Sequence, residues 1–426
     1  MTRAARGIAK VISAAAGPRT PTKGKKRSLR TVTPDQIVSS SPPRNDIAKK
    51  SVPFQEPRIV DKEDALSDEG FRDLKVPARE LRPSATLTTG QCFHWKAVDE
   101  PVGSSAWGTH NATQWIGTVR IPDTSDYLVL LLRETIDTTL YKVLFAPPDY
   151  DIVKTDDVLY QYFQLDQSLS VLYDQWSHEC SRLKRIAACI PGVRVICQDP
   201  WECLVSFLCS SNNNIPRIFG MLAKIRRTYG RPLLTLRTSD GNEETFYSFP
   251  SFEQLVAKAS EDELRNVCGM GYRAKYLLGT MEKIKAASGE PYLNSLRGVK
   301  SPLDVQEALI QFPGVGRKVA DCIALFSLRQ TEAIPVDVHV WDMARRDYAF
   351  NTSNVKSLTP TVYRAVGDLF RERFSTHSGW AHSLLFVAEL PSFRPVLPSD
   401  IREEMESFSK KRNAEKKATK AAKESE

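Results

Sequence analysis

Pro313-Gly314-Val315-Gly316-Arg317-Lys318 is the stretch that decides how this chain folds. Apolar residues recur at helical spacing on both sides of it, in residues 303–312 and 319–326. Glycine tolerates positive φ and close backbone approach, so the pattern predicts two helices joined by a tight turn. The first amides of a helix have no carbonyl partner and lie at the positive end of its dipole. We therefore expect this turn to bind an anion, and a phosphodiester group of a nucleic acid is the ligand that we expect.

Two ionisable residues close to the turn indicate chemistry as well as binding. Lys318 lies in the first helical turn, where the dipole and burial are both expected to lower its pKa and make it nucleophilic. Asp337, in Pro335-Val336-Asp337-Val338-His339, is predicted to cap the next helix, which would keep it ionised. Each residue alone is more often a surface lysine or a capping aspartate. Together, beside a phosphate-binding turn, they suggest amine chemistry on a nucleotide sugar.

The composition fits a globular protein with basic ends. The 426 residues are 41% hydrophobic, enough for two or three units with cores, and no apolar run is long enough for a membrane span. The net charge of +8 is uneven, because residues 1–34 and 408–426 together carry +13 and residues 35–407 carry −5. A DNA-binding face on the body must therefore be a local patch. The eight cysteines include no Cys-x2-Cys pair, so we expect reduced thiols and no metal site.

The two ends are expected to be tails. Residues 1–75 are interpreted as a disordered basic tail, and residues 393–426 as a basic C-terminal tail. Residues 1–20 are basic, free of acids and amphipathic, which is typical of a mitochondrial presequence or of an alanine-rich disordered tail. The clusters at 23–27 and 410–412 suit nuclear import, nonspecific DNA contact or a solvated surface equally.

The body between the tails is predicted to be α+β. Residues 76–155 are expected to form an antiparallel sheet domain, with strands at 115–120, 127–133 and 139–145 and with Gly90 between two strand-like pieces. The apolar period then changes to 3.6, which predicts a helical region at 156–392. One of its helices should begin at Asp199-Pro200, with the aspartate as N-cap.

Two loops in the helical region have residues suited to nucleic acid. The segment Asn212-Asn213-Asn214-Ile215-Pro216-Arg217 offers amides and a guanidinium that can read base edges or hold phosphates, although self-capping amides in a turn explain it as well. A glycine turn presents Tyr272 and Arg273 at a helix start. Tyrosine can wedge into a base step and arginine can hold a phosphate or an orphaned base, unless Tyr272 is simply core.

The combination of residues 313–318 with residues 335–339 resembles the helix-hairpin-helix, Gly-Pro-Asp superfamily of DNA glycosylases. Five collinear segments are similar to its branch of eukaryotic 8-oxoguanine DNA glycosylases, at residues 90–93, 198–217, 269–276, 312–348 and 379–386. Some superfamily relatives carry a four-cysteine iron–sulfur loop after the catalytic aspartate. No cysteine follows Cys322 here, so that cluster cannot form.

The resemblance implies the chemistry of a bifunctional glycosylase and apurinic/apyrimidinic lyase in base-excision repair. Lys318 would attack C1′, displace the damaged base and form a Schiff base that permits β-elimination, while Asp337 would stabilise positive charge on the sugar. The lesion would be 8-oxoguanine, with formamidopyrimidine also expected, opposite cytosine in duplex DNA. We expect a monomer without a cofactor, acting on damaged double-stranded DNA in the nucleus and with downstream repair proteins as candidate partners.

The resemblance also implies roles for the remaining residues. The base pocket would be formed by residues that bond or stack on the flipped base: Gly90, Cys322, Pro335, His382 and Phe386. The DNA backbone and the orphaned cytosine would be held by a second set: Asn212, Asn214, Arg217, Tyr272, Arg273, Gly314, Gly316 and His339.

Two positions depart from the family. His382 stands where glutamine is usual, which leaves the lesion range in doubt, and Glu389 stands where an aspartate usually orients the histidine matching His339. Two rival functions also stay open: a related glycosylase that removes other bases, and a non-enzymatic hairpin module that only binds duplex DNA.

Overall fold

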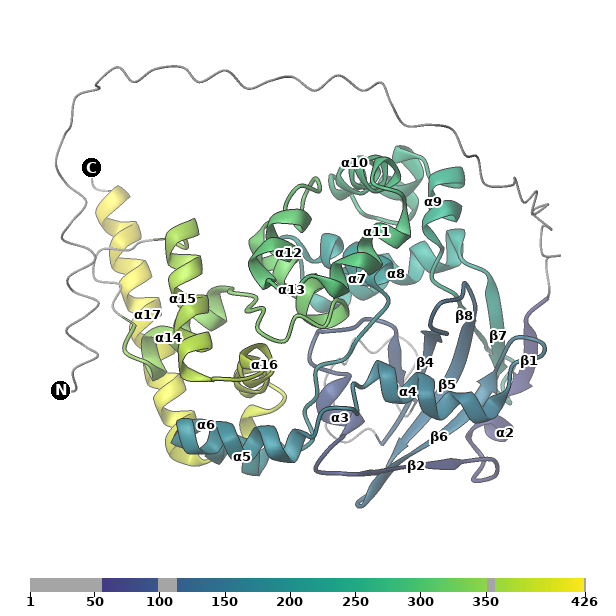
Figure 1. Cartoon of the computed structure of the whole chain (residues 1–426), viewed down its shortest axis with the longest axis horizontal. Helices are drawn as coiled ribbons and strands as arrows, with labels where there is room; N and C mark the ends of the chain where they lie inside the picture. Colours follow the sequence, from purple (N-terminus) through teal and green to yellow (C-terminus); the bar gives the residue numbers. More distant parts are fainter. Residues whose placement is uncertain (1–55, 99–112, 351–356, 425–426) are drawn as a thin grey trace, which may run out of the picture. The chain divides into compact units, whose positions relative to one another are not determined.

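The computed structural model describes residues 56–98, 113–350 and 357–424 (Figure 1). The expected presequence and the basic cluster at 23–27 lie outside the described residues. Within them, an antiparallel sheet precedes a largely helical region, so the predicted α+β class is confirmed. None of the described helices combines the length and the hydropathy needed to cross a bilayer.

The main sheet has five antiparallel strands in the order β2-β6-β5-β4-β3. They span β2 Arg72–Pro77, β3 Trp95–Ala97, β4 Gln114–Arg120, β5 Tyr127–Glu134 and β6 Thr138–Phe145. β5 is buried from Tyr127 to Leu132 because it has a strand on each side and packing on both faces. Alternate residues of β5 enter two different cores: Val129 and Leu131 join the large core, whereas Leu128 and Leu130 join a smaller one.

The sequence missed a second, three-stranded sheet. Its strands are β1 Arg58–Asp61, β7 Pro232–Arg237 and β8 Glu243–Tyr247, with β1 parallel to β7 and β7 antiparallel to β8. Ordered elements therefore begin at Arg58, ahead of the boundary expected near Val76, and a hairpin interrupts the region expected to be helical. Both errors share a cause, because β1 and β7 pair with each other although they lie far apart in the sequence. Local sequence patterns do not reveal such a pairing.

The segment around Gly90 also differs from the prediction. Residues Pro83–Thr86 form a short helix, α3, and β3 begins only at Trp95. The intervening residues follow turns, because Gln91 uses its side chain to bond backbone groups of another segment instead of joining a sheet ladder.

The helices follow the predicted pattern closely around the hairpin. They are α2 Lys62–Leu66, α4 Thr155–Tyr162, α5 Leu169–Glu179, α6 Ser181–Cys189, α7 Pro200–Ser210, α8 Ile215–Tyr229, α9 Phe252–Lys258, α10 Arg273–Ala286, α11 Glu290–Ser295, α12 Pro302–Leu309, α13 Arg317–Ser327, α14 Val338–Asp347, α15 Pro360–Arg373, α16 Ser378–Glu389 and α17 Ser399–Glu424. Helix α7 begins as predicted, with Asp199 accepting from the Glu202 amide and Pro200 in the first turn.

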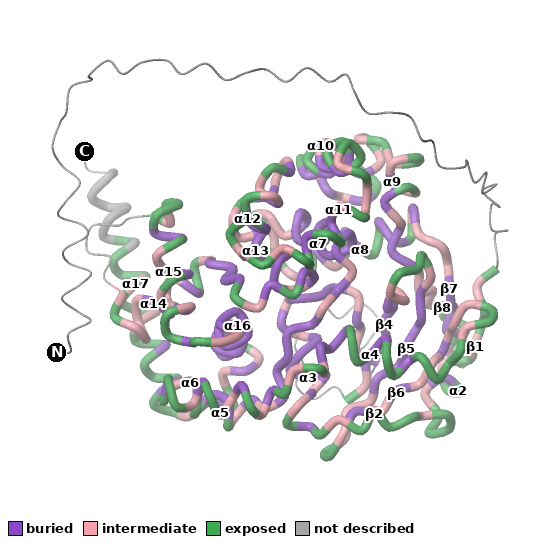
Figure 2. The backbone as a smooth tube through the Cα atoms, in the orientation of Figure 1, coloured by how far each residue is buried: buried purple, intermediate pink, exposed green. Residues whose placement is uncertain are grey.

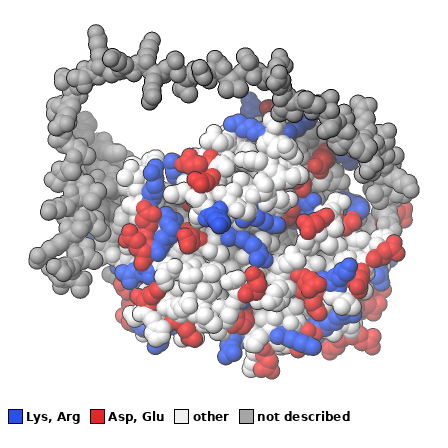
Figure 3. All heavy atoms as spheres, in the orientation of Figure 1, with Lys and Arg blue, Asp and Glu red and all other residues white. Residues whose placement is uncertain are grey.

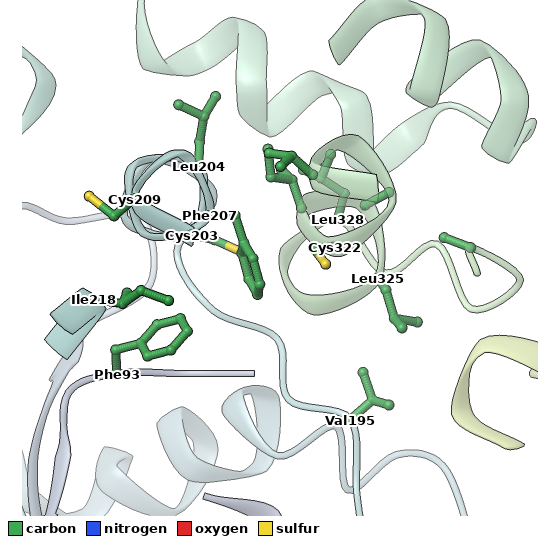
Figure 4. Close-up of a cluster of buried hydrophobic side chains, with 14 of the residues drawn as sticks. Phe93, Val195, Cys203, Leu204, Phe207, Cys209, Ile218, Cys322, Leu325 and Leu328 are labelled. Carbon is green, nitrogen blue, oxygen red and sulfur yellow. The ribbon is translucent and has the colours of Figure 1, made fainter. Parts of the chain in front are cut away.

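The centre of the helical region is α7, which is buried from Pro200 to Cys209 (Figure 2). It packs against α13, and the ring of Phe207 stacks on Phe326 with centroids 5.6 Å apart. Figure 4 shows Phe207 and the thiol of Cys322 pointing into the space between these two helices. A close-packed, largely apolar support therefore lies behind the helix that carries Lys318.

The C-terminal segment is not the disordered tail that the sequence predicted. Helix α17 buries Ile401 and Met405, which are four residues apart and so share one helical face. Ion pairs attach the helix to α6, through Arg182 with Glu404 at 2.6 Å and Arg185 with Asp400 at 2.5 Å. Composition suggested disorder because the apolar residues are few, but their spacing matches a helix that packs on the body.

Candidate active site at the helix hairpin

The turn between α12 and α13 has the predicted hairpin geometry. Phe312 and Val315 are buried and anchor it, and the Val315 amide donates to the Phe312 carbonyl at 3.1 Å. Gly314 has a φ of +79°, and a Cβ there would lie 2.7 Å from the ring of Tyr276. Glycine is therefore required at this position on two separate counts, the backbone conformation and the close approach.

Gly316 is a glycine for a different reason. It is the N-cap of α13 with a φ of −85°, which any residue can adopt, and a Cβ built on it meets nothing within 4 Å. No side chain among the described residues caps this helix terminus. The first amides of α13 thus face open space in which a phosphate can approach them closely.

An open groove of about 750 Å³ runs along this hairpin. One wall is the turn from Phe312 to Val319, and the other includes Ser211, Tyr272 and Tyr276. The hairpin and the two loops that the sequence singled out therefore border one surface. Figure 3 shows basic and acidic side chains interspersed over one face of the protein, in keeping with the negative net charge of residues 35–407.

Lys318 lies in the first turn of α13, half-buried, with its Nζ 5.5 Å from the centre of the Phe207 ring. Burial lowers the pKa of the Lys318 ammonium, but Cys322 and Asp337 raise it, and the net direction is upward. The predicted lowering is therefore wrong for the free protein. The sequence argument counted the helix dipole and burial, and it left out Cys322 on the next turn of the same helix and the carboxylate of Asp337.

Asp337 is the N-cap of α14, as the sequence predicted. Its carboxylate accepts from the amides of His339 at 2.9 Å and Val340 at 3.0 Å. The charge of Asp337 also acts on both Lys318 and His382. The carboxylate is thus held by backbone amides beside the lysine, in the arrangement needed to stabilise a developing positive charge.

Among the residues proposed for the base pocket, His382 and Phe386 are in ring contact, and Cys322 and Pro335 lie close in sequence to Lys318 and Asp337. The ring of Phe386 lies 6.3 Å from that of His382 and 6.0 Å, edge-on, from that of His339. Cys322 lies one turn after Lys318 on the same helix, and Pro335 is buried two residues before Asp337.

Gly90 is the remaining residue of this set, and no ring contact or hydrogen bond in the described residues joins it to the others. It has a φ of +78° and lies against Ile215, whose Cδ1 is 3.3 Å from a Cβ built on it. The next residue, Gln91, holds the turn in place by donating to the Arg194 carbonyl at 2.9 Å and accepting from the Ile196 amide at 3.0 Å.

His382 is unusual among the buried polar residues. It is only 4% exposed, and neither ring nitrogen makes a hydrogen bond of acceptable geometry within the described part of the chain. Burial lowers the pKa of its imidazole to about 4, so the ring is neutral at neutral pH. The backbone of Gly379 acts on this ring, but its geometry falls short of a hydrogen bond, so the neutral imidazole keeps one donor and one acceptor available to a bound base.

The asparagine loop serves its own backbone and also leaves groups exposed. Asn213 donates to the Cys209 carbonyl at 2.9 Å, and Asn214 caps α8 by accepting from the Arg217 amide at 3.1 Å. The self-capping interpretation therefore holds for these two residues. The side chains of Asn212 and Arg217 remain exposed.

The second loop turns inward to meet the first. Arg273 is buried and donates to the carbonyls of Ser211 at 3.0 Å and Asn212 at 3.1 Å, so it does not project outward as the sequence suggested. Tyr272 is 45% exposed, lies under the Arg273 guanidinium and donates to the same Ser211 carbonyl at 3.2 Å. The alternative that Tyr272 is core is wrong.

Three polar residues near the site have partners that the sequence did not predict. Glu389, which stands where an aspartate usually orients the histidine matching His339, accepts from Arg346 at 2.6 Å. Asp321 and Tyr363 form a buried pair next to α13, and the signal was a lone carboxylate in an apolar helix. Among the described residues, no group of histidine, cysteine or acidic side chains has the geometry to hold a metal ion.

Comparison with known proteins identifies both halves of the body. The model of the 8-oxoguanine DNA glycosylase N-terminal domain matches residues 73–204, and that of the helix-hairpin-helix GPD superfamily of base excision DNA repair proteins matches residues 205–364. The chain is 36% identical to N-glycosylase/DNA lyase OGG1 of Arabidopsis thaliana over 331 residues, which are 76% of this chain and 82% of that protein. It is 33% identical to N-glycosylase/DNA lyase of Saccharomyces cerevisiae over 346 residues, 75% of this chain and 86% of that one.

A solved structure agrees with these relatives. The 8-oxoguanine glycosylase/lyase of Clostridium acetobutylicum, in complex with double-stranded DNA containing cytosine opposite 8-oxoguanine, is 26% identical with a TM-score of 0.58. The match covers 73% of this chain and 92% of that one. With a lysine and a capped carboxylate beside a bare hairpin, and with relatives over most of its length, the chain belongs to the 8-oxoguanine DNA glycosylase family of N-glycosylase/DNA lyases.

Proposed function

We propose that this enzyme excises 8-oxoguanine, and formamidopyrimidine lesions as well, opposite cytosine in duplex DNA, through a Schiff base on Lys318. The observation that carries the proposal is the convergence of Lys318, Cys322 and Asp337 beside an uncapped hairpin. A phosphate-binding module requires only the amides of such a turn, whereas a half-buried amine beside an ionised carboxylate suits nucleophilic attack on a sugar carbon.

The neutral amine of Lys318 attacks C1′, the bond from C1′ to the base nitrogen breaks, and the base leaves with the electron pair and gains a proton. The attached nitrogen loses one proton, its lone pair forms the C=N bond as the C1′–O4′ bond breaks, and O4′ gains a proton, which gives a protonated Schiff base. Loss of a C2′ proton then breaks the C3′–O bond and releases the 3′ phosphate. Asp337 stabilises the positive charge that develops on the sugar.

The raised pKa of Lys318 adds one requirement, because the ammonium must lose a proton before it can attack. A base seated over the site replaces solvent around the Nζ. The resulting desolvation counteracts the raised pKa of the amine, which favours the nucleophilic form once a substrate is bound.

We assign opposite-base discrimination to Asn212, Arg217 and Arg273. The first two are exposed beside the groove, and Arg273 reaches the same place if it releases the carbonyls of Ser211 and Asn212. Support comes from the Clostridium acetobutylicum protein, whose structure holds DNA with cytosine opposite 8-oxoguanine. His382, with its two free ring nitrogens, is our candidate for the contact to the polar edge of the lesion.

Borohydride trapping tests the nucleophile. Wild-type protein incubated with a duplex containing 8-oxoguanine opposite cytosine should form a covalent adduct, because borohydride reduces the imine to a stable amine. Lys318→Gln should lose the adduct, and Lys258→Gln, which changes an exposed lysine on α9, should keep it. An undiminished adduct in Lys318→Gln would show that another amine forms the imine.

A lesion panel tests the substrate assignment. Excision rates should be higher for 8-oxoguanine and formamidopyrimidine opposite cytosine than for the same lesions opposite adenine. Arg217→Ala should reduce that preference, whereas Arg237→Ala, which removes an arginine paired with Glu243 in the second sheet, should leave it unchanged. Equal wild-type rates opposite cytosine and adenine would contradict the roles given to the two loops.

A further inference from the structure

A buried carboxylate lies one helical turn after Lys318 and takes no part in the chemistry proposed above. Asp321 is 4% exposed on α13. Its two oxygens accept from the side-chain amide of Gln306 on α12 at 2.8 Å and from the hydroxyl of Tyr363 on α15 at 2.5 Å. Both oxygens are therefore used, and the carboxylate joins three helices.

The Tyr363 hydroxyl extends this network to the segment that precedes Asp337. It accepts from the amide of Val336 at 3.2 Å, and the carbonyl of Ile334 lies at the same distance. A tyrosine hydroxyl has one proton, and the shorter bond to Asp321 takes it. One hydroxyl thus connects the residue one turn after Lys318 with the residue directly before Asp337.

This connection matters because the two reacting groups come from different helices. Lys318 belongs to α13 and Asp337 caps α14, with an irregular segment between Ser327 and Val338. Apolar packing of Ile334 and Val336 fills space, but it fixes position along the segment less sharply than a directed hydrogen bond does. Small displacements of reacting groups cost large factors in rate.

We propose that Asp321 and Tyr363 are positioning residues, a buried brace that sets Asp337 relative to Lys318 for base excision. The proposal rests on the proposed function of those two residues. It assigns no contact with DNA to the brace, which lies behind the site. A cavity of about 170 Å³, lined by Asp321, Tyr363, Arg364 and Arg371, adjoins the brace on the side of α15.

Both oxygens of Asp321 accept a hydrogen bond, which is the pattern of the ionised carboxylate, because a proton on the oxygen that faces Tyr363 would reverse the direction of that bond. The groups that face Asp321 are Gln306 from α12, Tyr363 and Arg371 from α15, and Arg317 from α13. Burial raises the pKa of Asp321 to about 6, while these four groups oppose the rise. Asparagine in its place has a single acceptor oxygen, so it can keep one of the two bonds.

The test is a pair of matched tyrosine variants in the full chain. Tyr363→Phe removes only the bridging hydroxyl. Tyr173→Phe is the control, since its hydroxyl also bonds backbone groups, the amide and carbonyl of Val193, away from the site. For each protein, single-turnover excision and binding to a duplex carrying an uncleavable abasic analogue are measured. We expect Tyr363→Phe to lower the excision rate roughly tenfold or more with binding within about twofold, and Tyr173→Phe to change neither.

A second variant covers the case in which Tyr363→Phe folds poorly. Asp321→Asn keeps the side-chain volume and should also lower the excision rate with little effect on binding. In the wild type the rate should rise with pH as Asp321 ionises near pH 6, and Asp321→Asn should flatten that part of the profile. A purely structural residue would not change the shape of the pH profile.

The proposal is overturned if Tyr363→Phe excises as fast as Tyr173→Phe, or if Asp321→Asn retains both the wild-type rate and the wild-type pH profile. Each rate is measured on whichever lesion the wild type releases. A failure of the lesion assignment therefore leaves this test intact, and a failure of Lys318 as nucleophile is detected separately by the trapping experiment.

Discussion

Two glycines of one turn, Gly314 and Gly316, show how differently the same residue type can be used. Gly314 is required by the protein itself, because its backbone is left-handed and Tyr276 fills the space of a side chain. Gly316 meets nothing, so the fold does not require it. The free space at Gly316 lies over the bare amides of α13, where a phosphate would be seated.

This contrast gives a paired prediction. Gly314→Ala should destabilise the protein by about 1–3 kcal/mol, because alanine is strained at positive φ and would also displace Tyr276. Gly316→Ser should leave the melting temperature unchanged or raise it, since serine is a better N-cap than glycine, yet it should weaken binding to duplex DNA. Thermal unfolding and a binding titration distinguish the two effects. Strong destabilisation by Gly316→Ser would contradict our account of that position.

At the residue scale, the sequence predicted what depends on near neighbours. The hairpin turn and the cap of α14 by Asp337 follow from local chemistry, and both are present. The direction of the Lys318 pKa and the inward turn of Arg273 were not predictable. The pKa direction depends on Cys322, one turn further along α13, and on Asp337 from another helix, and the arginine depends on the Ser211 carbonyl.

At the scale of a single element, α13 carries two ionisable side chains in different surroundings. Lys318 is half-buried at its start, and Asp321 is buried in its middle, where its pKa affects the stability of the fold. A carboxylate whose pKa is raised by burial binds its proton more tightly in the folded state than in the unfolded state. The free energy of unfolding therefore falls as pH rises from the unfolded value of 3.8 to about 6, and is constant above that.

Asp321→Asn should remove this dependence. Between pH 5 and pH 7.5 the wild type should lose about 1.4 kcal/mol of unfolding free energy that the variant does not lose. Denaturant unfolding of both proteins at the two pH values measures the difference, and subtraction cancels the other titrating groups. Identical pH dependence of the two proteins would mean that Asp321 does not titrate in this range.

Long elements with a clear amphipathic pattern were predicted better than short or mostly charged ones. Helices α7, α12 and α13 have clear periods, α7 and α12 also have capping side chains, and the sequence located all three well. Strand β1 is four residues long and has no partner nearby in the sequence. Helix α17 is mostly charged, and only the spacing of Ile401 and Met405 reveals the face that packs.

At the scale of the whole molecule, α17 packs on the helical region and links two of its helices by ion pairs. It bonds α6 through Arg182 and Arg185, and α14 through the ion pair of Arg412 with Asp342. In Figure 1 it runs beside α14 and α15, on the side of the helical region away from the sheets. The last helix of the chain thus supports the helix that begins at Asp337.

Two truncations test that role. A chain ending at Leu397 lacks α17, and loss of two buried apolar side chains should lower the stability by about 3–5 kcal/mol. A chain ending at Ala414 keeps Ile401, Met405 and Arg412, and should melt close to the full-length protein. Scanning calorimetry measures both melting temperatures. Equal melting of the two truncated chains would show that α17 contributes little.

The parallel pairing of β1 with β7 has a consequence for the order of events during synthesis. A ribosome adds about 5–20 residues each second, so β7 emerges roughly ten to forty seconds after β1. The five-stranded sheet can close in that interval, since β6 ends at Phe145. The first described strand therefore has no strand partner while the five-stranded sheet forms, until residue 237 has left the exit tunnel.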